Sequence, residues 1–207
     1  MHKILKNLFS GIIKMKNNLI LLPLVFITLT GCHKVEDPIV EIFTSEGNIK
    51  IELYQQKAPN TVDNFLAYAD SAYYDDALFY RTVKKDNQPN NKIKIEVIQG
   101  GLGFSDTDIE LPPIHHESTL QTGISHLDGT ISMARADTGS VTSEFFICIG
   151  DQPELDYDGQ RNPDRQGFSA FGRVIEGMDV VRLIHNLPDM NQIFIHPVKI
   201  DSIRRLK

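Results

Sequence analysis

Residues 129–149 read GTISMARADTGSVTSEFFICI, and this stretch decides the fold class. Its two ends, Gly129–Ala134 and Glu144–Ile149, are short runs rich in β-branched and aromatic residues, which favour β-strands. No helical pattern separates them, so the stretch lacks the strand–helix–strand alternation of a parallel sheet. It therefore indicates an antiparallel sheet of short strands.

The rest of the chain repeats this pattern on both sides. Five further strands are predicted at Ile39–Phe43, Asn48–Leu53, Leu78–Val83, Ser169–Val174 and Ile195–Ile203. Another is predicted where Ile93, Ile95 and Val97 alternate, and it ends at Gly101. Only two helices are predicted, one capped by Asn60 and one opened by Gly177 and stopped at Pro188. Many short strands with two helices predict a mostly β fold, with an antiparallel sheet closed as a barrel or a sandwich.

Length and charge restrict the classes of function. The chain has 207 residues, enough for one substantial domain, and a formal net charge of −6. Because the first 32 residues contribute only four lysines, the remaining residues carry −10. Such an acidic body is a poor partner for the phosphates of nucleic acids, so nucleic-acid binding is not expected.

The N-terminus has the features of an export signal. Lys14 and Lys16 precede the apolar run Asn18–Thr28, which is too short and too interrupted by Pro23 to be a membrane-spanning helix. Leu29-Thr30-Gly31-Cys32 follows directly and resembles a bacterial lipobox, in which the cysteine receives a lipid. The alternative is a buried N-terminal helix that ends in Gly-Cys, and Met15 is an alternative start to Met1.

This interpretation divides the chain into three parts. Residues 1–31 are the lipoprotein signal peptide, 32–38 the lipidated Cys32 and a short tether, and 39–207 the folded domain. The mature protein would be held at a membrane of the bacterial cell envelope, on the periplasmic or the surface side. Cys148 would then have no disulfide partner, and its apolar neighbours predict a buried structural thiol.

Isolated polar clusters carry little chemistry by themselves. Adjacent His115 and His116 point in opposite directions in an extended segment and rarely share an ion, so His115-His116-Glu117 is interpreted as a surface loop. No metal site is predicted.

Five segments in a fixed order carry a much more specific signal. They are Phe79–Val83 (FYRTV), Val97–Gly101 (VIQGG), Gly129–Ala134 (GTISMA), Ser143–Ile147 (SEFFI) and Phe171–Gly177 (FGRVIEG). Together they resemble the cyclophilin-type peptidyl-prolyl isomerases, from about Ile39 to the C-terminus. The resemblance implies a closed eight-stranded antiparallel barrel capped by two helices, with an outer groove that accepts an Xaa-Pro segment.

The resemblance also implies roles for individual residues. Arg81 matches the catalytic arginine, Phe146 and Leu155 match walls of the proline pocket, and Gln99 and Ala134 match residues that hold the substrate backbone. For Phe146 and Leu155 the alternative interpretation is ordinary core packing. The implied partners are proline-containing polypeptides, and the protein is expected to be a monomer. No cofactor is expected, because rotation about the Xaa-Pro bond breaks no covalent bond.

The sequence departs from the family pattern at positions around this groove. Glu96 replaces a pocket phenylalanine, Glu144 a groove glutamine and Glu154 a tryptophan. Two apolar departures, Val97 for a methionine and Phe168 for a histidine, remain substrate-binding candidates together with Glu144. The segment Lys84–Lys92 is longer than the usual tight turn, which leaves the alignment at Glu96 and Val97 open.

The acidic departures leave two functions open. A glutamate paired with Arg81 would hold its guanidinium away from substrate, whereas the same contact would alternatively orient it. The first hypothesis is a lipid-anchored isomerase that assists the folding of exported proteins, with reduced or altered activity. The second is a non-catalytic module of the same fold that binds proline-containing segments or a partner protein.

Overall fold

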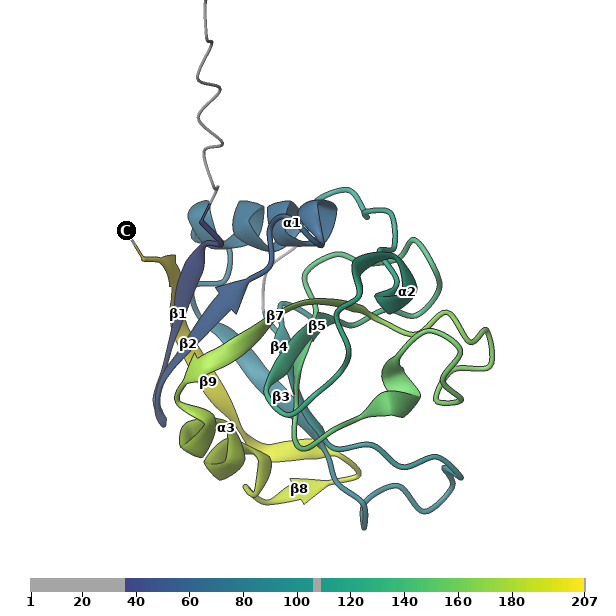
Figure 1. The fold of residues 1–207 in the computed structure, drawn as a ribbon. Helices are drawn as coiled ribbons and strands as arrows, with labels where there is room; N and C mark the ends of the chain where they lie inside the picture. Colours follow the sequence, from purple (N-terminus) through teal and green to yellow (C-terminus); the bar gives the residue numbers. More distant parts are fainter. Residues whose placement is uncertain (1–35, 106–108, 207) are drawn as a thin grey trace, which may run out of the picture. The chain divides into compact units, whose positions relative to one another are not determined.

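The computed structural model describes residues 36–105 and 109–206 (Figure 1). The predicted signal peptide and Cys32 lie outside these residues. None of the helices within the two described ranges is long and apolar enough to cross a membrane.

Eight antiparallel strands close into a barrel (Figure 1). They are β1 (Ile39–Thr44), β2 (Gly47–Leu53), β3 (Ala77–Val83), β4 (Val97–Gly101), β5 (Thr130–Met133), β6 (Phe145–Cys148), β7 (Ser169–Glu176) and β9 (Ile193–Arg205). Around the barrel their order is β1-β2-β7-β5-β6-β4-β3-β9, and the sheet closes because β9 pairs with β1. The two-residue β8 (Asp189–Met190) pairs only with the beginning of β9. The predicted closed eight-stranded barrel is confirmed.

One predicted strand is shorter than expected. β4 begins at Val97, and residues 93–96 are not part of the sheet. Side chains bind most of this backbone, since the carbonyl of Ile93 accepts from Arg161 Nη1 (2.6 Å) and that of Ile95 from Gln88 Nε2 (2.8 Å). The carbonyl of Glu96, by contrast, accepts from the backbone N–H of Ile149, which follows β6 (2.9 Å). Alternating apolar residues indicated the correct side-chain directions here, but not the backbone pairing.

Two helices cover the barrel, as predicted. α1 (Pro59–Asp70) packs against β7 and β9, and α3 (Met178–His185) packs against β2 and β4. Figure 1 shows the two helices at opposite ends of the barrel. The single turn α2 (Thr119–Thr122) and a 3-10 turn (Pro153–Leu155) were not predicted, because each is too short for a helical period to recur in the sequence.

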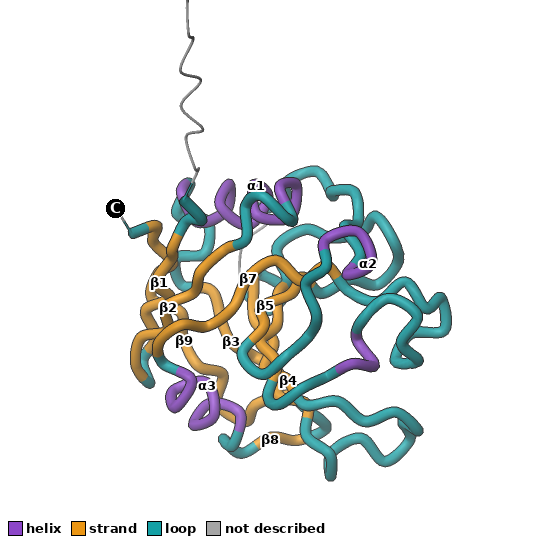
Figure 2. The backbone as a smooth tube through the Cα atoms, viewed as in Figure 1, coloured by secondary structure: helices purple, strands orange, loops and turns teal. Residues whose placement is uncertain are grey.

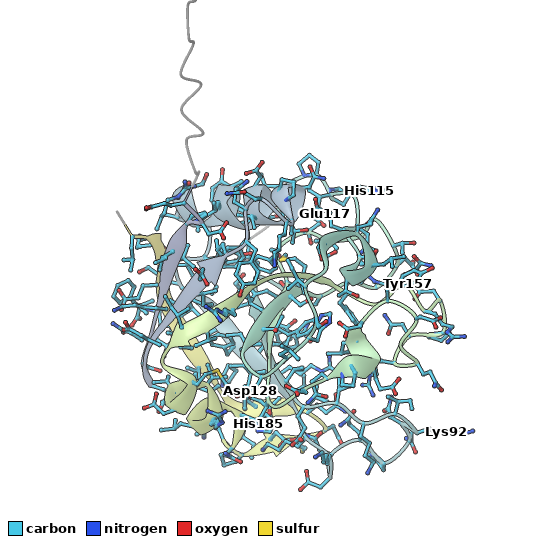
Figure 3. All side chains as sticks on the ribbon, viewed as in Figure 1. Lys92, His115, Glu117, Asp128, Tyr157 and His185 are labelled. Atoms are coloured by element: carbon cyan, nitrogen blue, oxygen red, sulfur yellow. The ribbon has the colours of Figure 1, made fainter. Side chains whose placement is uncertain are left out.

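The beginning of α1 corrects two predictions. Pro59 is the first helical residue, so Asn60 lies inside the helix and does not cap it. Glu117 binds this end instead: Oε1 accepts from the backbone N–H of Asn60 (3.2 Å), and Oε2 from that of Thr61 (2.8 Å). Glu117 and His116 are therefore buried, and only His115 is on the surface (Figure 3).

Side chains on the strands alternate between the barrel interior and its outer wall. On β6, Phe145 and Ile147 belong to the interior core, whereas Phe146 and Cys148 belong to a separate apolar cluster. Figure 2 shows long loop connections gathered on the side of the barrel away from β1 and β2. The second cluster lies on the strands next to these connections.

Candidate active site

The second apolar cluster, which we call the outer cluster, contains Val83, Ile95, Val97, Phe146, Cys148 and Leu155, with half-buried Ala134 and Phe168 packed against it. Five of its members are predicted substrate-binding residues that lie far apart in the sequence. The structure brings them together in a second buried cluster, separate from the interior core, so Phe146 and Leu155 also have the packing of an apolar core. The outer cluster is thus an apolar group on the outer wall of the barrel, with Phe146 4% exposed and Leu155 fully buried.

Three predicted residues form one row across adjacent strands. Arg81 on β3 lies opposite Gln99 on β4, and Gln99 lies opposite Phe146 on β6. Directly opposite residues share a face of the sheet, and neighbouring strands lie about 4.8 Å apart. The row therefore places the guanidinium of Arg81 on the same outer wall as the apolar cluster.

A bulge in β3 sets the direction of Arg81. The register shifts between Phe79 and Arg81 on both sides of the strand. An extra residue at a bulge lets two consecutive side chains leave the same face. Phe79 enters the interior core, while Tyr80 and Arg81 both reach Gln99 on the outer wall.

Neutral oxygens hold the Arg81 guanidinium. Nη1 donates to Gln99 Oε1 (2.8 Å), while Nε (3.1 Å) and Nη2 (2.5 Å) both donate to Gln192 Oε1. In the described part of the chain, Arg81 forms no salt bridge. Burial lowers the pKa of Arg81 from its ordinary value, yet a guanidinium stays charged in proteins. The cation thus keeps its charge without a carboxylate partner among the described residues.

Two of the acidic departures bind elsewhere. Glu96 pairs with the exposed Lys85 (3.0 Å), and Glu144 Oε2 accepts from Tyr80 Oη (2.6 Å) while its Oε1 accepts from the backbone N–H of Gly103 (2.8 Å). Neither glutamate contacts Arg81, so direct pairing of a glutamate with the cation, on which both alternatives were based, is not seen among the described residues.

Glu144 nevertheless acts on the site through a directed chain. Arg81 donates to Gln99, Gln99 Nε2 donates to Tyr80 Oη (2.6 Å), and Tyr80 donates to Glu144. A guanidinium only donates and a carboxylate only accepts, which fixes the direction of each bond. Burial, followed by the charge of Glu144, raises the pKa of Tyr80, so the phenol remains a donor. Glu144 therefore helps to orient Gln99 through Tyr80, and Gln99 in turn binds Arg81.

Glycines make room for the Glu144 carboxylate. A Cβ at Gly101 would lie 2.5 Å from Glu144 Oε1, and Gly101 has a φ of +144° that other residues rarely adopt. This explains why a glycine ends β4. Beside the carboxylate lies a cavity of about 360 Å³, lined by Leu102, Gly103, Ile109, Glu110 and Thr142–Glu144.

The remaining predicted positions also lie around the outer cluster. The rings of Phe168 and Phe146 meet edge to face at 5.3 Å, and the guanidinium of Arg135 lies over the Phe168 ring. Glu154 precedes Leu155 and accepts from the backbone N–H of Gln160 (2.8 Å), so its carboxylate binds within its own loop.

Cys148 is buried, as predicted. Burial raises the pKa of its thiol well above the usual value.

Sequence reasoning missed the support of Phe146. His126 stacks on its ring at 5.9 Å between centroids, with Nδ1 2.7 Å from Asp156 Oδ1 and Nε2 2.9 Å from Ser132 Oγ. The arrangement has the order of a hydrolytic triad, but Ser132 is completely buried and is no accessible nucleophile. These residues hold Phe146 in place.

Ile95 was also missed, although it stands two residues before Val97 and shares its face. In the outer cluster Ile95 provides apolar surface, while Glu96, aligned with the family's pocket phenylalanine, turns to Lys85. The alternation of Ile93, Ile95 and Val97 is the sequence signal that could have identified Ile95 as a neighbour of Val97.

A barrel that carries, on its outer wall beside an apolar cluster, an arginine held by amide oxygens and in no salt bridge among the described residues is typical of a class of peptide-binding enzyme. Residues 39–205 match the model of the cyclophilin type peptidyl-prolyl cis-trans isomerase/CLD family. The chain belongs to this family, and its activity is peptidyl-prolyl cis–trans isomerisation.

Individual relatives agree with this assignment. The chain is 37% identical over 187 residues to a peptidyl-prolyl cis-trans isomerase of Acinetobacter baylyi, covering 85% of this chain and 89% of the relative. It is 35% identical to peptidyl-prolyl cis-trans isomerase A of Dickeya dadantii, covering 81% and 84%. A cyclophilin of Cryptosporidium parvum, solved in the presence of the dipeptide Ala-Pro, matches with a TM-score of 0.66 and 25% identity, over 82% of this chain and 99% of that one.

Proposed function

We propose that Arg81 is the catalytic residue of this isomerase and that the outer cluster binds the proline ring of its substrates. The observation that carries the proposal is the state of the guanidinium: half-buried beside the apolar cluster, held by two neutral amide oxygens and in no salt bridge among the described residues. A relative of the same fold was solved with Ala-Pro, which supports proline-containing polypeptides as substrates.

The physical basis is the electronic structure of the Xaa-Pro bond. Resonance opposes rotation with a barrier of about 18–20 kcal/mol, and uncatalysed exchange takes tens to hundreds of seconds. In the twisted state the prolyl nitrogen becomes pyramidal and gains an available lone pair. Described residues use three of the five N–H groups of Arg81, which leaves two for the substrate. A donor that binds the twisted state better than the planar one lowers the barrier.

The catalytic proposal is tested by exchange spectroscopy on the full-length chain in detergent. We expect NMR exchange peaks between the cis and trans forms of an Xaa-Pro peptide to appear in the presence of the protein and to vanish with Arg81→Ala. The non-catalytic alternative predicts peptide binding without accelerated exchange. Exchange that persists at the full rate in Arg81→Ala would refute the catalytic role of Arg81.

We further propose that the protein is lipid-anchored through Cys32 in the bacterial cell envelope and assists the folding of exported proteins. The support is the order of Lys14 and Lys16, the apolar run 18–28 and the lipobox-like residues 29–32. Expression with a radiolabelled fatty acid is expected to label the wild-type chain but not Cys32→Ser, whereas Cys148→Ser serves as the matched control. Labelling of Cys32→Ser would exclude this anchor.

A further inference from the structure

We infer that Gln192 is a positioning residue for Arg81 and that the long segment Lys84–Lys92 holds Gln192 in place. The inference rests on the proposed catalytic role of Arg81. Gln192 lies in the turn between β8 and β9, 111 residues from Arg81 in the chain. The family resemblance marked the long segment only as a departure in length, and it did not point to the turn.

Gln192 determines the plane of the guanidinium. A single oxygen, Oε1, accepts from both Nε and Nη2 of Arg81 along one edge, while Gln99 accepts from Nη1. With both amides in place, the two remaining N–H groups point in fixed directions. If Gln192 Oε1 is removed, Gln99 alone holds the guanidinium through one bond, and the group is free to rotate about that contact.

The orientation of the Gln192 amide is itself determined. Its Nε2 donates to the backbone carbonyl of Asn87 (3.1 Å), and a carbonyl oxygen accepts only. The nitrogen must therefore face Asn87, which directs the oxygen toward Arg81. The backbone adds a second constraint: Asn191 and Gln192 have φ values of 55° and 74°, and the N–H of Gln192 donates to Asp189 Oδ2 (3.0 Å).

The long segment is fastened to the same turn. Asp189 Oδ1 accepts from Lys84 Nζ (3.0 Å), and its Oδ2 accepts from Asn87 Nδ2 (3.0 Å). Asn87 also binds its own segment, because Nδ2 donates to the carbonyl of Thr82 and Oδ1 accepts from the N–H of Lys84. These bonds fix the Asn87 carbonyl that Gln192 requires.

The opposite side of the segment is anchored as well. Gln88 is 1% exposed, and its Nε2 donates to the carbonyls of Lys84 (2.7 Å) and Ile95 (2.8 Å). Its Oε1 accepts from Arg161 Nη1 (2.9 Å). Hydrogen bonds therefore connect the segment to three places: the loop that carries Arg161, Ile95 of the outer cluster, and the turn that carries Gln192.

The test compares Gln192→Met, which keeps the size of the side chain and removes both the acceptor for Arg81 and the donor to Asn87, with Met190→Ala, an exposed residue of the same turn. Because a lost hydrogen bond to a charged group is substantial, we expect kcat of Gln192→Met to fall about tenfold. KM is expected to stay within about twofold, because the outer cluster is unchanged. Met190→Ala is expected to behave as the wild type. The full-length chain in detergent is used throughout, with thermal unfolding as a check of folding.

A double-mutant cycle tests whether the long segment acts through Gln192. We expect Asn87→Ala to lower kcat about threefold in the wild type but to have no further effect in Gln192→Met, since the intermediary is already absent. An additive cycle would show that Asn87 acts by another route and would overturn this part. The Arg81 Nε–H signal in NMR is expected to broaden in both single variants but not in Met190→Ala.

Arg81→Ala, measured in the same assay, separates the two proposals. An unchanged kcat in Gln192→Met together with an inactive Arg81→Ala overturns the positioning role and leaves the proposed function intact. An active Arg81→Ala overturns the proposed function itself.

Discussion

The interior core and the outer cluster use the same strands for different purposes. On β6, Phe145 is completely buried and meets Phe65, Tyr74 and Phe79 ring to ring, whereas Phe146 meets His126 and Phe168 on the other face. The interior residues are surrounded by other apolar side chains. The outer cluster is bordered by Arg81, Gln99 and a buried polar chain behind Phe146.

The difference shows where stability and function are separated in this fold. Interior side chains lower the free energy of the folded state by removing apolar surface from water. The members of the outer cluster are also buried, but they pack on the outer wall of the barrel, where the proposed substrate site lies. Adjacent residues of identical chemistry are therefore expected to respond to substitution in opposite ways.

The pair Phe145 and Phe146 gives the largest expected effect. Phe145→Ala is expected to lower the free energy of unfolding by about 3–5 kcal/mol, because it leaves a cavity among aromatic rings. Phe146→Ala is expected to cost about half as much stability but to lower kcat/KM about 10- to 100-fold, since the proline ring loses its main contact. Chemical denaturation and exchange spectroscopy measure the two quantities. Equal loss of stability with no selective loss of activity in Phe146→Ala would remove the distinction between the clusters.

Arg81→Ala is expected to give the next largest effect. Loss of one preorganised donor to a developing charge typically lowers the rate about 10²- to 10³-fold, and we expect kcat/KM to fall in that range. The free energy of unfolding is expected to change by less than about 1 kcal/mol, because Arg81 forms no salt bridge among the described residues. Arg173→Ala, which removes an exposed arginine paired with Glu52, is the matched control. A similar loss of activity in the control would point to a general charge effect.

Glu144 tests the polar border of the outer cluster. Glu144→Leu leaves the Tyr80 hydroxyl and the Gly103 N–H without their acceptor, and kcat/KM is expected to fall about threefold to tenfold. Glu144→Gln retains an acceptor at the same place and is expected to lose no more than about twofold. If Glu144→Gln were instead several-fold more active than the wild type, the carboxylate would be inhibitory rather than orienting. Peptide exchange rates on the three proteins decide between these outcomes.

The residue pattern was sufficient for the antiparallel strands because its information is local, whereas the choice of a closed barrel over a sandwich came from the family resemblance. Alternation of apolar residues along β1 and β2 reports directly which side chains face inward. The predicted site residues came together for a related reason: Arg81, Gln99 and Phe146 lie within strands whose pairing follows from the fold.

The rest of the site depends on contacts without a local pattern. Gln192 reaches Arg81 across 111 residues, and nothing near it in the sequence distinguishes it from a surface glutamine. The bulge at Tyr80 is one extra residue in one strand, which periodicity cannot register. Likewise, the partners of Glu96 and Glu144 depend on which of several nearby donors each carboxylate reaches.

The smallest expected effect separates the clusters by their response to acid. Among the described residues, the interior core contains no histidine, whereas His116 and His185 lie near the outer cluster. His185 Nε2 lies 3.1 Å from the carbonyl oxygen of Val83. His116 Nδ1 lies 2.8 Å from Oγ of Ser169, the residue after Phe168. Burial lowers the pKa of both histidines from about 6.5. The unfolded chain therefore takes up protons before the folded one as the pH falls.

Stability is thus expected to be complete above about pH 7 and to decrease toward pH 5, by no more than about 1.4 kcal/mol per pH unit for each histidine. His185→Gln is expected to flatten this dependence in urea unfolding experiments, because a neutral amide titrates in neither state. His115→Gln, which changes an exposed neighbour of His116, is expected to leave the slope unchanged. A slope that is the same in His185→Gln, His115→Gln and the wild type would show that burial of His185 does not couple folding to pH. Because both buried rings adjoin the outer cluster, activity is expected to decline with stability over this interval, whereas the aromatic packing of the interior core is independent of it.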